Sequence, residues 1–154
     1  MTSTASDLEK KKVLFLCTHN SARSQMAEAL LRAMYADRYE AYSAGVAATS
    51  VDSRAVRAML EIGIDISAQR SKSTEKFQDT IFDLVVTVCD RAKQACPICS
   101  TQLQLPSKSP RAKEVIHRSF ADPATAAGSE EEQLEAFRRV RDEIKDWVSR
   151  TFGR

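Results

Sequence analysis

Two short apolar runs that each end in a cysteine constrain the fold of this chain more than any other feature. The first run is VLFLC at 13–17, and the second is FDLVVTVC at 82–89. Short runs of aliphatic residues between polar segments are typical of strands buried in a sheet. Two weaker candidates for strands are YEAYSAG at 39–45 and EVIH at 114–117. The pattern therefore predicts a small sheet of buried strands.

Helical patterns lie between and after these runs. From Ser24 onward, apolar residues recur at helical spacing, with Ser21 or Ser24 as the expected cap. A second helix is expected to end near Gly63, because glycine favours the backbone conformation that terminates helices. Ser129 and Glu132 have the spacing of a capping box and precede one apolar stripe, which predicts a long C-terminal helix. The residues of this stripe are Leu134, Phe137, Val140, Ile144, Trp147 and Val148.

The alternation of strands and helices predicts an α/β fold with a parallel sheet covered on both faces. A chain of 154 residues is long enough to bury a core without the help of disulfides. Residues 1–12 are polar and are expected to form a flexible tail, so the domain is expected to span 13–154. We find no repeat or linker, and LPSKSPRAK at 105–113 is interpreted as a surface loop. We therefore expect a single domain.

Composition excludes several classes of function. The chain carries 23 basic and 21 acidic residues, and this near balance does not favour a nucleic-acid partner. Its apolar runs are far shorter than the roughly 20 residues that span a membrane. Residues 1–12 lack the apolar core of a secretory signal, so we expect a cytoplasmic protein with reduced cysteines. The four cysteines are unevenly spaced, which indicates chemistry rather than a disulfide framework, and they are Cys17, Cys89, Cys96 and Cys99.

The loop that follows the first run has the features of an oxyanion site. Five residues, Thr18 to Ala22, separate Cys17 from Arg23 and lead into a helix. Backbone N–H groups of such a loop and the helix N-terminus attract anions, and the Arg23 guanidinium matches two oxygens of a tetrahedral oxyanion. The same field favours a thiolate at Cys17. The alternative is a buried cysteine that ends a strand, with Arg23 on the surface.

The position of the second cysteine supports this interpretation. Ligands of parallel sheets bind beyond the carboxyl ends of the strands. Cys17 and Cys89 both fall at such predicted ends, so we expect them at the same edge of the sheet. Packing of Cys89 in a buried strand is the alternative.

Five segments resemble one protein family. VLFLCTHNSARSQMAEALL at 13–31 resembles the phosphate-binding loop of the low-molecular-weight protein tyrosine phosphatase fold. RSQMAE within it, SAG at 43–45 and GIDIS at 63–67 are similar to the thioredoxin-coupled arsenate reductase branch. VTVCDRAKQACP at 86–97 and HRSFADPA at 117–124 extend the resemblance over nearly the whole chain after the tail. The resemblance implies a four-stranded parallel sheet flanked by helices.

The resemblance also implies a role for each matching residue. Cys17 becomes the nucleophile, and Arg23 binds the oxyanion together with the loop amides. Asn20 and Ser24 order the loop or stabilise the thiolate. Asp122 becomes the acid and base, although Asp-Pro is also an ordinary turn sequence. The full oxyanion-binding segment implied in this way is Thr18, His19, Asn20, Ser21, Ala22, Arg23 and Ser24.

The arsenate reductase branch implies a relay of thiols. Cys89 attacks the Cys17–arsenic adduct and releases arsenite, and Cys96 then attacks Cys89 and moves the disulfide outward. Arsenate is the implied substrate and thioredoxin the implied reductant, acting on a monomeric protein without a resident cofactor or metal. Cys99 has no counterpart in the family pattern, and it is an alternative resolving thiol.

Two other functions remain open from the sequence. The first is a low-molecular-weight phosphatase, which needs only Cys17 because water can release phosphate from the phosphocysteine. Cys89, Cys96 and Ala124 argue against it, because phosphatases of this group usually place an aromatic residue after Asp-Pro. The second is a thiol sensor or metal-binding module without enzymatic activity that uses CPIC at 96–99 as half of a zinc site.

Two features of the resemblance concern positive charge near the loop. His19 stands where glycine is common in the family, and a protonated imidazole there further stabilises the thiolate, or the ring faces solvent without a role. Some relatives hold a potassium ion. The possible counterparts of its ligands in this chain are Asn20, Glu28, Ser43 and Asp65. The sequence alone assigns no metal to this chain.

Overall fold

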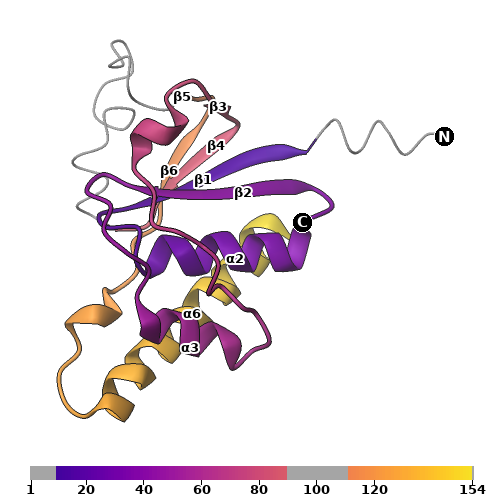
Figure 1. Ribbon diagram of the computed structural model, residues 1–154. Coiled ribbons are helices and arrows are strands. Elements are labelled where there is room, and N and C mark those ends of the chain that lie inside the picture. Colours follow the sequence, from indigo (N-terminus) through magenta and orange to yellow (C-terminus); the bar gives the residue numbers. More distant parts are fainter. Residues whose placement is uncertain (1–9, 90–110, 154) are drawn as a thin grey trace.

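A four-stranded parallel sheet lies at the centre of the protein (Figure 1). The computed structural model describes residues 10–89 and 111–153. The strand order is β2-β1-β4-β6, and the strands are β1 (Lys11–Cys17), β2 (Tyr39–Gly45), β4 (Leu84–Thr87) and β6 (Val115–His117). The predicted four-stranded parallel sheet is therefore confirmed. β1 begins two residues before the apolar run, because Lys11 and Lys12 already pair with β2.

Helices cover one face of this sheet (Figure 1). They are α2 (Arg23–Tyr35), α3 (Ser53–Leu60) and α6 (Glu130–Phe152). α2 and α6 pack side by side, and α3 packs against α6. The capping box at the start of α6 is confirmed, since the Ser129 side chain accepts the N–H of Glu132 and the Glu132 side chain accepts the N–H of Ser129. The stripe predicted for α6 is buried except for Trp147, which is partly exposed.

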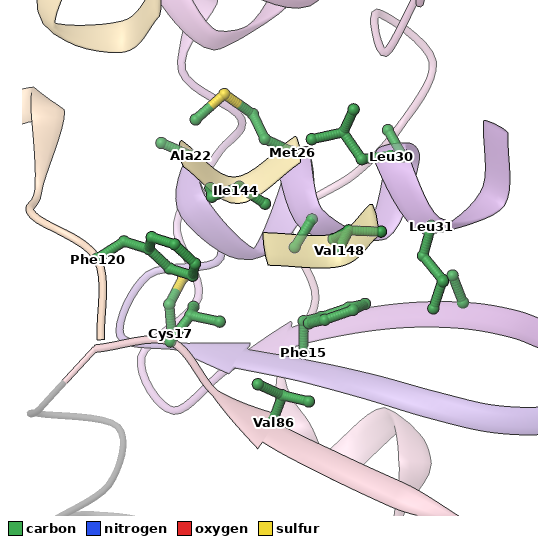
Figure 2. Close-up of a cluster of buried hydrophobic side chains, with 14 of the residues drawn as sticks. Phe15, Cys17, Ala22, Met26, Leu30, Leu31, Val86, Phe120, Ile144 and Val148 are labelled. Carbon is green, nitrogen blue, oxygen red and sulfur yellow. The ribbon is translucent and has the colours of Figure 1, made fainter. Parts of the chain in front are cut away.

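The core lies between the sheet and these helices. Phe15 and Cys17 project from the same face of β1 toward α2 and α6, as two residues with period-two spacing must (Figure 2). Their neighbours from the helices include Met26, Leu30 and Ile144, each fully buried. Burial of the central strand on both faces explains why its sequence is continuously apolar.

The opposite face carries a cluster of aromatic side chains. Tyr42 of β2, Phe77 of η1 (Thr74–Phe77) and Phe82 of β3 (Ile81–Phe82) make three edge-to-face contacts, with ring centroids 5.5–5.6 Å apart. β3 pairs in parallel with β5 (Arg111–Ala112) to form a second, two-stranded sheet. The sheet is therefore covered on both faces in the part of the chain that the structure describes.

Three local predictions were wrong. The run at 82–89 is not one strand, because Asp83 interrupts it and its carboxylate accepts the backbone N–H of Lys12 at 2.8 Å. Part of the expected surface loop at 105–113 forms β5 by pairing with β3. Neither expected serine caps α2, because Ala22 is the N-cap and no side chain caps it. The first two exceptions arise from partners that are distant in the sequence.

No helix in the described part of the chain combines the length and the apolar character needed to cross a membrane. The 23-residue helix α6 is long enough to cross a bilayer, but its charged residues leave no apolar stretch of that length.

Candidate active site

The loop between β1 and α2 is held by a buried asparagine in an unusual backbone conformation. Asn20 has φ 51°, in the left-handed region that asparagine tolerates better than most residues. Its side-chain Nδ2 donates to Ser24 Oγ at 2.7 Å, and Ser24 Oγ lies 2.9 Å from Cys17 Sγ. Because the Ser24 oxygen accepts from Asn20, its hydroxyl hydrogen can point at the sulfur. This hydrogen-bond chain joins the loop conformation to the Cys17 thiol.

The end of β2 supports the loop from behind. A Cβ atom added to Gly45 would lie 2.7 Å from both Asn20 N and Thr18 O, and 2.9 Å from His19 C. Real Cβ atoms essentially never approach backbone so closely, so only glycine fits between β2 and the loop. The SAG segment therefore has a steric role in building the site.

Gly45→Ala is predicted to disable the loop. The added methyl group must displace the backbone of Thr18–Asn20, and a shift of about 1 Å in a binding group costs on the order of 100-fold. Titration calorimetry with inorganic phosphate should show a loss of affinity of this size, and thermal unfolding should show whether the variant is folded. A folded variant that binds phosphate as tightly as the wild type would contradict the steric role of Gly45.

α3 also contacts the loop through its N-cap residue. The backbone N–H of Asp52 donates to Ser21 O at 2.9 Å, and the Asp52 side chain caps α3 through the N–H of Arg54. Burial favours a higher pKa for Asp52, but hydrogen bonds from the Arg54 side chain and backbone lower it below its ordinary value. Asp52 thus joins α3 to the loop, since its side chain caps the helix and its backbone N–H donates to Ser21.

A cavity of about 420 Å³ opens beside the loop. It is lined by Thr18, His19, Arg23, Cys89, Ser119, Phe120, Ala121 and Asp122. Arg23 donates from NH1 to Phe120 O at 3.2 Å, and its NH2 lies 3.6 Å from Asp122 Oδ2. Cys17 does not line the cavity, because only 2% of it is exposed, but its neighbour Thr18 does. A guanidinium and a carboxylate therefore face a small polar cavity next to the buried thiol.

Asp122 has the contacts of a turn residue and also faces the cavity, so it has features of both interpretations that the sequence offered. Its Oδ1 accepts the N–H of Ala124 at 3.0 Å and caps the short helix η2 (Pro123–Thr125), as a turn residue would. Its carboxylate also lines the cavity and faces Arg23. The turn therefore presents the carboxylate to the site.

Cys89 lies at the same sheet edge as Cys17. β1 and β4 are neighbours with Leu16 opposite Thr87, so residues two beyond this pair meet at the end of the sheet. Cys89 Sγ lies 3.3 Å from Thr18 Oγ1, and the residue is 3% exposed. The structure brings Cys89, Arg23 and Asp122 to one cavity, and Cys17 and Cys89 lie at one edge of the sheet, as expected from the strand ends.

The other predicted residues lie either in the loop or outside the described residues. His19 is exposed and lines the cavity, and its carbonyl accepts hydrogen bonds from Ser71 Oγ and the N–H of Thr49. Ala22, the last residue of the loop, is buried. Cys96 and Cys99 lie outside the described residues, and the zinc alternative lies there with them.

The sequence interpretation missed the segment that supports the loop from its other side. Gln25 is fully buried, and its Nε2 donates to Asn20 O, Asn20 Oδ1 and Arg70 O at 2.8–3.0 Å. The Lys72 N–H also donates to Asn20 Oδ1, at 2.7 Å. A glutamine amid the apolar positions of α2 was the available signal. For Lys72, nothing in the local sequence indicated a role.

The residues suggested as potassium ligands do not fit a potassium site. Asp65 is exposed, and its carboxylate accepts the N–H of Ser67 at 2.9 Å. Lys72 Nζ instead lies 3.6 Å from Glu28 Oε1 and 3.4 Å from Ser43 Oγ. An ammonium group therefore stands beside the carboxylate that a cation would need. Over the described ranges 10–89 and 111–153, no group of three or more acidic, histidine or cysteine side chains is arranged to hold a metal.

Comparisons with known proteins agree with this geometry. The family model for low molecular weight phosphotyrosine protein phosphatase matches residues 12–152. The arsenate reductase of Halalkalibacterium halodurans is 46% identical over 137 residues, which cover 89% of this chain and 91% of that protein. A solved arsenate reductase in the oxidized state is 30% identical with a TM-score of 0.71, covering 93% of this chain and 97% of that one.

A solved phosphatase is similar to the same extent in fold. The low molecular weight protein tyrosine phosphatase of T. tengcongensis is 26% identical with a TM-score of 0.71, and the match covers 94% of this chain and 99% of that one. The fold alone therefore does not separate the two activities.

Proposed function

The chain belongs to the low-molecular-weight phosphotyrosine protein phosphatase family, and from that premise we propose that it is an arsenate reductase that is recycled by thioredoxin. The observation that carries the proposal is the position of Cys89. Its thiol lines the same cavity as Arg23 and Asp122, and it touches the hydroxyl of Thr18 in the anion loop. Hydrolysis of a phosphate ester needs no second thiol there, whereas reduction of arsenate does.

The first step forms an adduct at Cys17. Arg23 and the amides of the loop bind the arsenate oxygens, and the Cys17 thiolate attacks arsenic and displaces one oxygen. Asp122 delivers the proton with which that oxygen leaves as water. Ser24 stabilises the thiolate before attack, because its hydroxyl lies 2.9 Å from the sulfur. Arsenic remains As(V) in this adduct.

The second step transfers two electrons. The Cys89 thiolate attacks the sulfur of Cys17, a Cys17–Cys89 disulfide forms, and the electron pair of the broken sulfur–arsenic bond stays on arsenic. Arsenic leaves as arsenite, so two thiols are oxidised while As(V) becomes As(III). Cys96 then attacks Cys89, which frees Cys17 and leaves a Cys89–Cys96 disulfide for thioredoxin to reduce. The same proposal includes a monomeric enzyme in the cytoplasm, where thiols are kept reduced.

A coupled assay tests the proposal. Purified protein with arsenate, thioredoxin and thioredoxin reductase should consume NADPH, and consumption should stop when thioredoxin or arsenate is omitted. Hydrolysis of para-nitrophenyl phosphate, run beside it, should be present, because the loop and Asp122 suffice for that reaction. It should be weak, because Ala124 stands where phosphatases of this group usually place an aromatic residue. Robust hydrolysis without arsenate-dependent NADPH consumption would favour the phosphatase.

Asp122→Asn is predicted to slow chemistry without weakening substrate binding. The amide cannot exchange a proton, so kcat should fall by about 10²- to 10⁴-fold. KM should stay level or fall, because the variant removes the negative charge 3.6 Å from the Arg23 guanidinium. Steady-state kinetics as a function of pH should show the loss of one limb of the profile.

Asp65→Asn is a matched control for this variant. Asp65 also accepts the N–H of the residue two positions ahead, but it lies in an exposed turn away from the cavity. It should leave kcat unchanged. If Asp122→Asn behaves in the same way, Asp122 is only a turn residue.

A further inference from the structure

A buried carboxylate lies behind the anion loop, on the side away from the cavity. Glu28 of α2 is 5% exposed. Its Oε1 accepts the hydroxyl of Ser43, and Lys72 Nζ lies 3.6 Å away. Arg32 contacts the other oxygen, but half of the Arg32 side chain is exposed, whereas only 14% of the Lys72 side chain is. The lysine is therefore the inner partner of the carboxylate.

The backbone of the same lysine holds the loop. The Lys72 N–H donates to Asn20 Oδ1 at 2.7 Å, and the Lys72 carbonyl accepts the N–H of Gly45 at 2.8 Å. Asn20 in turn contacts Ser24, whose hydroxyl reaches the Cys17 sulfur. Lys72 is therefore linked to the Cys17 thiol through the side chains of Asn20 and Ser24.

We propose that the Lys72 ammonium is a tethered internal cation, which takes the place of a free monovalent cation beside Glu28 and so holds the anion loop in its binding conformation. Lys72 is a positioning residue in this proposal, because it acts through Asn20. The inference rests on the loop being the oxyanion site, and it does not depend on arsenate being the substrate.

The hydrogen bonds that the nearby Asn20 oxygen already accepts support the assignment of Lys72 as the internal cation. A free cation needs oxygen lone pairs, but Asn20 Oδ1 already accepts from Lys72 N and Gln25 Nε2. A buried carboxylate without a counter-charge is costly. The half-exposed Arg32 pairs with Oε2 of Glu28, and Lys72 supplies the cation beside Oε1 on the buried side. Burial lowers the pKa of Lys72 below its ordinary value, although the Glu28 carboxylate opposes this shift.

Lys72→Met tests the proposal with inorganic phosphate as the probe. Calorimetric titrations are run in potassium chloride and in tetramethylammonium chloride at equal ionic strength. The wild type should bind phosphate equally in both salts. The variant in tetramethylammonium should lose about 10- to 100-fold in affinity, the range typical when a group that orients binding residues is removed. Potassium should restore at least part of the loss, because it can enter the vacated position.

Two further variants separate this inference from a loss of folding. Lys76→Met removes an exposed lysine four residues away and should resemble the wild type in both salts. Glu28→Gln combined with Lys72→Met removes both charges, and it should bind phosphate nearly as well as the wild type, with no response to potassium. If Lys72→Met does not fold, the phosphate affinity of the double variant in the two salts is compared with that of the wild type instead.

Three results would overturn the inference. They are a wild type that needs potassium, a Lys72→Met variant whose affinity is the same in both salts, and a double variant as impaired as the single one. Because phosphate is the probe, failure of the arsenate reductase proposal would appear separately, in the NADPH assay.

Discussion

Replacing Cys17 by serine should abolish arsenate reduction and ester hydrolysis together. Both reactions begin with attack by the Cys17 sulfur, and a serine hydroxyl in the same place is not ionised near neutral pH. The loss should be about 10³-fold or more, because a variant without its nucleophile keeps only the contributions of binding and oxyanion stabilisation. NADPH consumption and para-nitrophenyl phosphate hydrolysis measure the two activities on one sample.

Phosphate binding provides the control for this variant. Arg23, the loop amides and the Asn20–Ser24 hydrogen bond remain, so Cys17→Ser should still bind inorganic phosphate. Loss of binding as well as activity would point to a collapsed loop rather than to a missing nucleophile. Substantial reductase activity with intact binding would remove Cys17 from the mechanism.

Replacing Cys89 by serine should abolish only the reductase. The sulfur of Cys89 lies 3.3 Å from Thr18 Oγ1 at the edge of the cavity, and no other described residue of the cavity lining carries a thiol that could attack the Cys17 sulfur. Serine preserves the contact with Thr18, so the loop should keep its shape. Arsenite release under thioredoxin turnover should disappear, while weak hydrolysis of para-nitrophenyl phosphate should persist. Parallel loss of both activities would show that Cys89 is a packing residue.

The third thiol gives this prediction its matched comparison. Cys96→Ser should still release one equivalent of arsenite and then stall as a Cys17–Cys89 disulfide, because the disulfide cannot move outward. Cys99→Ser should turn over nearly normally. Mass spectrometry of the alkylated, arsenate-oxidised protein maps the bridges. A Cys89–Cys99 bridge in the wild type would transfer the resolving role to Cys99.

Local patterns predicted the elements that depend on residues close in sequence. The capping box of Ser129 and Glu132 forms within one helical turn, and the apolar stripe that follows it needs only the helical period. The order of strand, loop and helix around Cys17 could be predicted for the same reason. The shared edge of Cys17 and Cys89 also followed from the sequence, because carboxyl ends of parallel strands lie at one edge.

Family resemblance added what local patterns could not. Asp122 in its Asp-Pro turn has no distinguishing feature in the sequence alone, and only the similarity of HRSFADPA made it a candidate acid. In the structure the turn directs the carboxylate toward Arg23, so the turn geometry is compatible with the proposed acid role. Here the geometry combines two interpretations that the sequence had presented as alternatives.

By itself, the sequence determined the order of the main strands and helices, the loop between β1 and α2 and the thiol that ends β1, because periodicity and capping act over a few residues. Only the tertiary structure decided which groups surround that loop. Gly45, Gln25 and Lys72 approach Asn20 from three separate segments of the chain. Ser24 does not cap α2 as expected, and its hydroxyl lies beside the Cys17 sulfur. Such contacts depend on how segments that are distant in the sequence pack against one another. Steric fit and buried charge between two segments cannot be predicted from the sequence pattern of either segment alone.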